Sequence, residues 1–117
     1  MKTVLIVDDE DKIRRTYSKL FTKNGFNVVE ASKAYDAYKA LLLKKIDLIL
    51  LDINMPGVDG ATLFNIIKLF PQTIKVIVSS VYPLDDQLNL IEGAHDYFDK
   101  SEGLSKLMSK VKSVMVN

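Results

Sequence analysis

Five polar side chains follow short apolar runs along the chain: Asp8, Asp9, Asp52, Ser80 and Lys100. Three of them are carboxylates, which repel one another at close range unless a cation compensates their charge. Oxygen ligands of this kind suit a hard divalent cation such as Mg²⁺. An ammonium group and a hydroxyl beside that cation could hold phosphoryl oxygens, and one carboxylate would remain as a nucleophile. The set therefore predicts a magnesium-dependent phosphate site.

Each of these residues, taken alone, has an ordinary structural explanation. Aspartate and serine are common where a strand turns into a helix, and a lysine near a helix start is usually solvated. The prediction of a site depends on all five side chains reaching one place. That in turn depends on the strands and helices that carry them.

Short apolar runs alternate with helical patterns throughout the chain. The runs predict strands over residues 4–7, 27–31, 46–51, 74–78 and 97–98. Asn24 and Gly25 predict the end of the first helix, and Ser32 is expected to cap the second. This (βα)₅ alternation predicts an α/β fold, with one parallel sheet covered by helices on both faces and its ligand site at the carboxyl ends of the strands.

The composition of the chain excludes some classes of function. The 117 residues include 16 Lys and Arg, 15 Asp and Glu and no cysteine, so neither a bulk basic field nor a cysteine-ligated metal site is expected. The length predicts a single domain over residues 1–117. The apolar run before Asp8 is too short for a secretory signal, and no run approaches the length of a membrane span, so a cytoplasmic location is expected.

Four ordered motifs resemble the receiver domains of two-component response regulators. Residues 7–10 are similar to the family's acidic pair, and residues 52–60 to its D-x-x-M-P-x-x-D-G stretch around the phosphoacceptor. Ser80 stands at its Ser/Thr position, and residues 93–100 resemble its G-A-x-x-Y/F-x-x-K segment. Because the motifs keep the family's order over nearly the whole chain, the resemblance is specific.

The resemblance implies a three-layer flavodoxin-like fold with strand order 2-1-3-4-5, and a phosphorylation-dependent signalling switch. Asp52 would accept the phosphoryl group, and Ser80 and Lys100 would hold its oxygens. Tyr97 would relay the change to the face of the fourth helix, fifth strand and last helix. The implied Mg²⁺ ligands are Asp8, Asp9, Asp52 and the backbone carbonyl of Asn54.

Partners also follow from the resemblance. A sensor histidine kinase or a histidine phosphotransfer protein would be the donor, and a downstream effector protein or an output domain would respond. Binding to nucleic acid or membrane is not expected of this domain, whereas a phosphorylation-dependent homodimer is compatible with it. The domain would promote its own phosphotransfer and dephosphorylation without a separate turnover substrate, so it is not expected to be an enzyme.

Several residues outside the implied site also carry expectations. Ser101 stands where the family usually has a proline after a cis bond, which predicts a trans bond or a locally altered loop here because non-proline cis peptides cost about 2.5–4 kcal/mol. His95 is expected at the surface without a chemical role. Arg14 and Arg15 are expected on a solvated helix face, although the resemblance places that helix against the kinase.

Alternative functions differ in the residues they need. A haloacid-dehalogenase-type phosphatase needs D-x-D-x-T/V after the first strand, and residues 8–12 read DDEDK. A flavodoxin-like cofactor binder needs a Ser/Thr/Gly-rich phosphate loop at that place. A receiver-like interaction module that is not phosphorylated in use stays open as the alternative.

Overall fold

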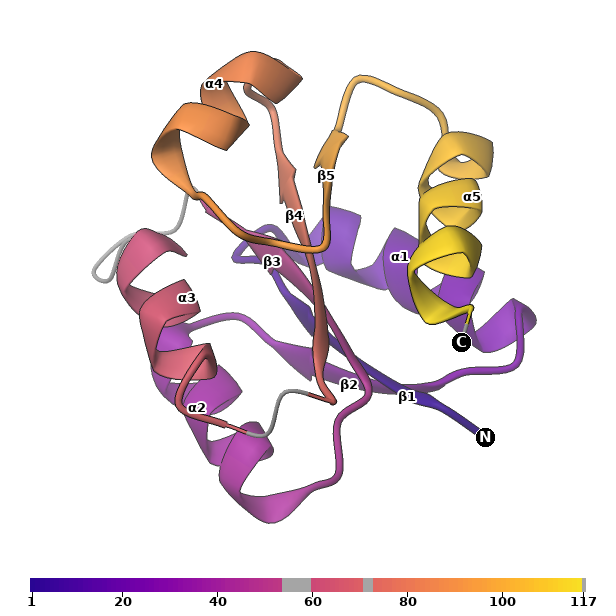
Figure 1. The fold of residues 1–117 in the computed structure, drawn as a ribbon. Coiled ribbons are helices and arrows are strands. Elements are labelled where there is room, and N and C mark those ends of the chain that lie inside the picture. Colours follow the sequence, from indigo (N-terminus) through magenta and orange to yellow (C-terminus); the bar gives the residue numbers. More distant parts are fainter. Residues whose placement is uncertain (54–59, 71–72, 117) are drawn as a thin grey trace.

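Five parallel strands form one sheet in the order β2-β1-β3-β4-β5 in the computed structural model, which describes residues 1–53, 60–70 and 73–116 (Figure 1). The strands are β1 (Thr3–Val7), β2 (Asn27–Ala31), β3 (Leu48–Asp52), β4 (Lys75–Ser80) and β5 (Asp96–Asp99). The helices are α1 (Asp11–Lys23), α2 (Ala34–Leu43), α3 (Gly60–Ile67), α4 (Leu84–Leu90) and α5 (Leu104–Met115). The predicted flavodoxin-like fold and strand order are confirmed.

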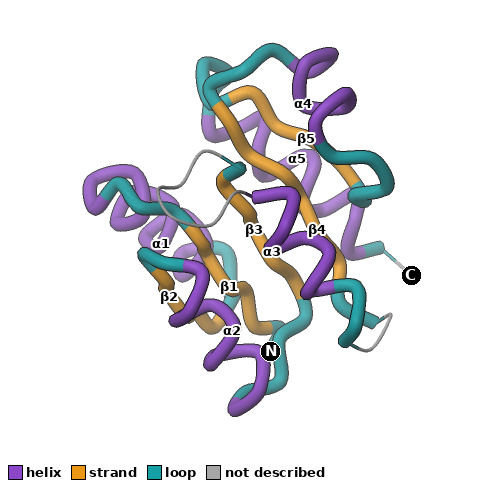
Figure 2. The backbone as a smooth tube through the Cα atoms, turned by 90° about the vertical axis from the view of Figure 1, so that its left-hand side faces the viewer, coloured by secondary structure: helices purple, strands orange, loops and turns teal. Residues whose placement is uncertain are grey.

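The sheet is buried on both faces, which explains why its strands read as nearly continuous apolar runs. On one face, side chains from α1 and α5 pack against Ile6, Leu50 and Ile77. On the other face, α2 and α3 pack against Leu5 and Ile49. Figure 2 turns the side of α2 and α3 toward the viewer, with the strands behind these helices. The result is a three-layer arrangement.

Strand limits differ slightly from the apolar runs. The run that begins at Ile46 continues into β3, but the strand itself starts at Leu48. Ile46 is buried all the same, so its apolar character reflects core packing rather than strand pairing. At its C-terminal end, β4 extends beyond its apolar run. Ser79 and Ser80 still pair with β5, although their polarity suggests a loop.

Helix ends confirm one sequence expectation and overturn another. Asn24 is the C-cap of α1, and Gly25 follows with a φ of 87°, a left-handed conformation that favours glycine. Ser32, however, does not cap α2. The N-cap residue is Lys33, and no side chain caps the helix with a hydrogen bond. The serine lies one residue too early for its hydroxyl to serve the first turn from the cap position.

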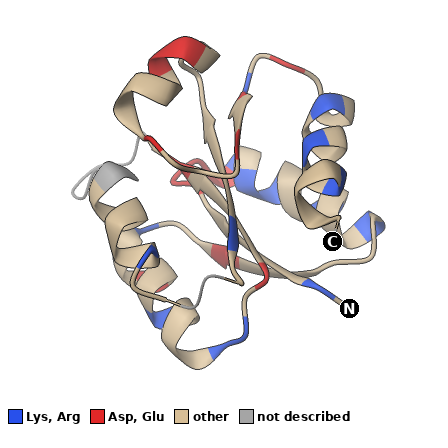
Figure 3. Cartoon of the chain, in the orientation of Figure 1, with Lys and Arg blue, Asp and Glu red and all other residues tan. Residues whose placement is uncertain are grey.

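Charge is unevenly distributed over the helices. Figure 3 shows basic segments along α5 and an acidic first turn of α4. The acidic pair there is Asp85 and Asp86, which lie at the positive end of the helix dipole.

Within the described residues, no helix has the length and apolar character needed to cross a bilayer.

His95 ties the start of β5 to β4. Its Nδ1 accepts a hydrogen bond from the backbone N–H of Val76 at 3.0 Å, and the backbone N–H of His95 donates to the Val76 carbonyl at 2.9 Å. The residue is exposed, as expected, but the imidazole has a structural role in the sheet. Burial, with a contribution from the charge of Lys75, lowers the pKa of His95 below its ordinary value. The ring is therefore neutral when it accepts this bond.

Acidification should weaken the fold through His95. Because the pKa is lower in the folded than in the unfolded chain, the unfolded chain binds the proton first, and the stabilisation is present above the unfolded pKa of about 6.5 and lost as pH falls below it. We expect the drop in melting temperature between about pH 7.5 and 5.5 to shrink in His95→Asn, whose oxygen can accept from Val76 without titrating. An equal drop in both proteins would contradict this role.

Candidate functional site

Three carboxylates meet at one edge of the sheet. Asp8 follows β1 and Asp52 ends β3, and these strands pair directly, with Val7 opposite Leu51. One carboxylate oxygen each from Asp8, Asp9 and Asp52 lies within 4.8 Å of the others. Asp8 and Asp52 are buried, whereas Asp9 is exposed. Adjacent parallel strands thus deliver acids 44 residues apart in sequence to one point, as the sequence predicts.

Lys100 supplies the compensating charge. Its Nζ lies 2.7 Å from Asp8 Oδ2 and 3.4 Å from Asp52 Oδ2, and its side chain is only 6% exposed. Burial alone would lower the pKa of Lys100, but the hydrogen bond to Asp8 and the charges of Asp52 and Asp8 outweigh it, so the pKa lies above its ordinary value. The ammonium group is therefore a permanent cation beside two buried carboxylates.

Ser80 lies next to this cluster at the end of β4. The neighbouring strand ends at Asp52, which pairs with Ser79, and Lys100 donates its backbone N–H to the Ser80 carbonyl at 2.8 Å. The Ser80 hydroxyl oxygen accepts a hydrogen bond from the backbone N–H of Tyr82 at 3.1 Å. Since the hydroxyl acts here as an acceptor, its own proton remains suited to donation.

The segment after β5 is held by Ser101 rather than by a proline. Both the backbone N–H and the hydroxyl of Ser101 donate to Asp99 Oδ1, at 2.9 and 2.8 Å. The backbone hydrogen bond from Ser101, reinforced by the one from its hydroxyl, lowers the pKa of the Asp99 carboxyl. No cis peptide bond occurs in the part of the chain that the structure describes, so the predicted trans bond after Lys100 is confirmed.

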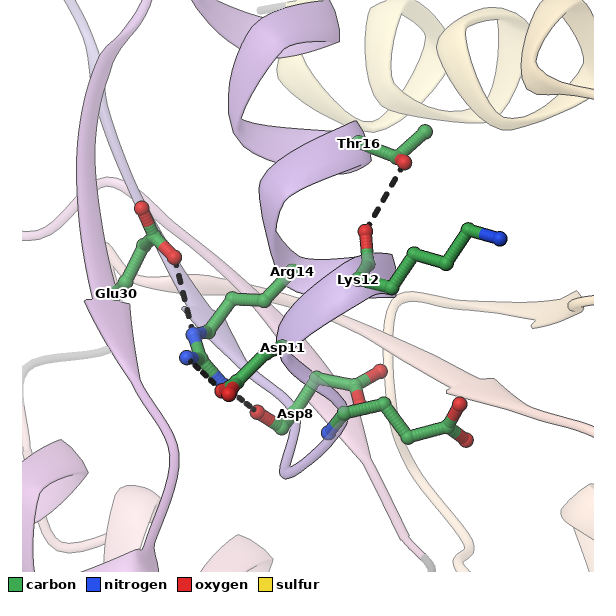
Figure 4. Close-up of polar contacts among 7 residues, drawn as sticks. Asp8, Asp11, Lys12, Arg14, Thr16 and Glu30 are labelled. Atoms are coloured by element: carbon green, nitrogen blue, oxygen red, sulfur yellow. Dashed lines mark hydrogen bonds and ion pairs between the residues drawn. The ribbon is translucent and has the colours of Figure 1, made fainter.

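Arg14 braces the loop that carries the acidic pair (Figure 4). Its guanidinium donates to the backbone carbonyl of Asp8 at 2.8 Å and to Glu30 Oε1 on β2 at 3.0 Å, and it also pairs with Asp11. The side chain is only 14% exposed, so the expectation of a solvated arginine is wrong. The helical pattern places Arg14 away from the core, but two of its partners, Glu30 and the Asp8 carbonyl, come from outside the helix.

Tyr17, a residue of α1, lies near enough to the acidic cluster and to Lys100 for their charges to act on its hydroxyl. It is buried, and helical spacing identifies it only as a core residue. Burial raises the pKa of Tyr17 above its ordinary value, against the opposing effects of the nearby Ser79 hydroxyl and of the Lys100 charge. The phenol therefore stays neutral and adds no charge to the acidic cluster.

Tyr97 points into the core from β5. Its hydroxyl donates to the Ile91 carbonyl at 2.7 Å and accepts from the backbone N–H of Ala94 at 3.2 Å. These bonds fasten the connection between α4 and β5 to a strand that ends next to Lys100. The Tyr97 side chain therefore links β5 to the backbone that follows α4.

The acidic cluster fits a divalent cation. It is the one group of three or more acidic, histidine or cysteine side chains with this ligand geometry in residues 1–53, 60–70 and 73–116. Its donors are all carboxylate oxygens, which suit Mg²⁺ rather than a softer metal. The expected fourth ligand, the backbone carbonyl of Asn54, lies outside the described residues.

The family model described as "Response regulator receiver domain" matches residues 4–112. A solved structure of response regulator protein TrrA from Thermotoga maritima, in complex with Mg²⁺-BeF, superposes with a TM-score of 0.84 at 29% identity, covering 98% of this chain and 100% of that one. Sporulation initiation phosphotransferase F from Bacillus subtilis is 29% identical over 96% of this chain and 92% of its own length.

Other relatives are longer. The phosphate regulon transcriptional regulatory protein PhoB from Pseudomonas aeruginosa is 31% identical over 97% of this chain, which spans only 52% of PhoB. The shared part is therefore about half of that regulator.

Proposed function

Because the chain belongs to the response regulator receiver domain family, we propose that it is a phosphorylation switch in which Asp52 accepts a phosphoryl group from a phosphohistidine donor. The observation that carries the proposal is the placement of three carboxylates and the Lys100 ammonium at one sheet edge. Residues 1–117 would form a single receiver domain located in the cytoplasm. The chemistry is that of an acyl phosphate formed on a carboxylate.

Phosphoryl transfer to Asp52 would be a simple displacement of the donor imidazole from phosphorus. An oxygen of Asp52 attacks phosphorus, the P–N bond to the donor imidazole breaks, and its electron pair leaves with the ring nitrogen. Mg²⁺, when bound by Asp8, Asp9 and Asp52, would offset negative charge on the phosphoryl oxygens. Lys100 already lies 3.4 Å from the Asp52 carboxylate and would hold one oxygen as a point charge. The Ser80 hydroxyl would donate to another.

The response would pass through Tyr97 to the face made by α4, β5 and α5. Support comes from the Tyr97 hydroxyl, which binds the backbone at two points of the α4–β5 connection. A change in the position of β5 next to Lys100 would reach α4 through these bonds. We propose a sensor histidine kinase or a histidine phosphotransfer protein as the donor, and an effector protein or output domain as the receiver of the signal.

The names of the relatives fit both kinds of output. One is a phosphotransferase of similar length, and another is a transcriptional regulator about twice as long. The domain would promote its own phosphorylation and dephosphorylation without turning over a separate substrate. The competing function, a receiver-like interaction module, predicts the same fold but no phosphoryl transfer.

One experiment separates these two functions. The protein is incubated with a small acyl phosphate and Mg²⁺, and its intact mass is followed. We expect a base-labile increase of about 80 Da in the wild type and none in Asp52→Asn, which keeps the shape of the side chain but lacks the nucleophilic carboxylate. A wild type without adduct would favour the interaction module, and an adduct that survives Asp52→Asn would place the phosphoryl group elsewhere.

A further inference from the structure

One fully buried amide lies at the centre of α4. Gln87 has no exposed surface, and its Nε2 donates to the Tyr82 carbonyl at 2.8 Å and to the Phe98 carbonyl at 2.9 Å. Both acceptors are carbonyl oxygens, so only the NH₂ group can face them. The orientation of the amide is therefore set by its partners.

The opposite side of this amide is unsatisfied. Gln87 Oε1 is buried and has no hydrogen-bond partner among the described residues. A buried acceptor without a partner destabilises a fold. Stability accounts for the NH₂ group, which donates to two carbonyls, but not for the buried oxygen, so this side chain carries a cost that a functional role would explain.

These two bonds reach the backbone on both sides of the proposed phosphoryl site. Tyr82 lies two residues after Ser80, and its N–H is the donor to the Ser80 hydroxyl oxygen. Phe98 lies two residues before Lys100 and belongs to the core of β5. A single side chain thus joins α4 to the segment that carries Ser80 and to the strand that leads to Lys100.

The two acceptors differ in their freedom to move. Phe98 is fully buried and paired within the sheet, opposite Ser79. Tyr82 lies in the exposed connection between β4 and α4. A Ser80 side chain drawn toward a phosphoryl oxygen would carry with it the Tyr82 N–H that is bonded to its oxygen, whereas the Phe98 carbonyl would stay with the sheet.

We propose that Gln87 is a positioning residue that couples the phosphoryl group on Asp52 to helix α4, an inference that rests on the proposed function. Displacement of the Tyr82 carbonyl changes one of the two bonds that Gln87 donates, while the bond to Phe98 provides a fixed point. The amide therefore transmits the state of Ser80 to the middle of α4. This coupling runs beside the one through Tyr97 and uses a different helix position.

The test compares Gln87→Met with Asn89→Met. Methionine is close to glutamine in length and shape but donates no hydrogen bond, and Asn89 is an exposed residue of the same helix. Backbone amide signals of α4 and of the site are recorded by NMR before and after phosphorylation with an acyl phosphate and Mg²⁺. We expect the response of α4 to fall to about half or less in Gln87→Met, with an unchanged response at Lys100 and an unchanged control.

A second measurement uses the wild-type protein alone, so it does not depend on the folding of a variant. The side-chain NH₂ signals of Gln87 in the wild type should be protected from exchange and should shift on phosphorylation, because one acceptor moves. Unchanged Gln87 signals, or a full α4 response in Gln87→Met, would overturn the coupling while leaving Asp52 as phosphoacceptor. A wild type that forms no adduct would instead refute the proposed function, and the coupling with it.

Discussion

Replacing Lys100 with methionine should lower the free energy of unfolding in metal-free buffer by about 3–5 kcal/mol, the range for removing one partner of a buried ion pair. The reason is local. Asp8 and Asp52 are both buried, and the ammonium group lies 2.7 and 3.4 Å from their oxygens. Without it, two adjacent carboxylates would have to share the edge of the sheet with no internal cation.

The same substitution should strengthen magnesium binding. Lys100 Nζ lies among the oxygens that would bind the metal, and a single charge 4 Å from a divalent ion repels it by about 2 kcal/mol even at the dielectric constant of water. Removal of that repulsion corresponds to an affinity gain of about ten-fold or more. Mg²⁺ should therefore recover most of the stability lost in Lys100→Met and add less to the wild type.

Chemical denaturation with and without Mg²⁺ measures both effects. Lys106→Met is the matched control, since Lys106 pairs with Glu102 on the surface and its side chain is 58% exposed. Exposed pairs contribute about 0–1 kcal/mol, so this variant should resemble the wild type in both buffers. A Lys100→Met protein as stable as the control without metal would show that the buried carboxylates do not need this cation.

The position of the acidic cluster could be predicted from the sequence because it depends on two strong local signals. Apolar runs too short for helices end at Asp8 and Asp52, and parallel strands bring such ends to the same edge. Lys100 also follows a strand, so its approach was expected. Its contact with Asp8, 92 residues away, depends on the strand order, which periodicity does not reveal and which only the family resemblance implied.

The contacts of Arg14 and Gln87 could not be predicted from the sequence. Helical spacing tells which side of a helix faces the core, but it does not identify partners from other elements. Arg14 binds Glu30 on β2 and the Asp8 carbonyl, so a polar position on α1 becomes part of the site's support. Gln87 lies in a short helix, and its buried NH₂ group donates to two carbonyls outside that helix. Only the assembled fold reveals these contacts.

Asp9→Ala should abolish magnesium binding with almost no effect on the metal-free fold. Asp9 is the exposed member of the cluster, so its removal takes away a ligand without uncovering a buried charge. In the wild type, Mg²⁺ at 100 times its dissociation constant should raise the free energy of unfolding by about 2.7 kcal/mol, and in Asp9→Ala this gain should disappear. Relief of repulsion from Asp8 and Asp52 should leave the metal-free variant equal to the wild type or slightly more stable.

The comparison with Asp36→Ala shows whether the metal effect belongs to the cluster. Asp36 is also an exposed aspartate, on α2 and outside the cluster, so its removal changes net charge equally and should leave the gain from Mg²⁺ intact. If both variants lost the gain, Mg²⁺ would be acting through general screening of negative charge. If neither lost it, the ion would bind without Asp9. Only a loss confined to Asp9→Ala makes the exposed carboxylate a ligand, because the two buried carboxylates then remain paired with Lys100 and do not hold the metal alone.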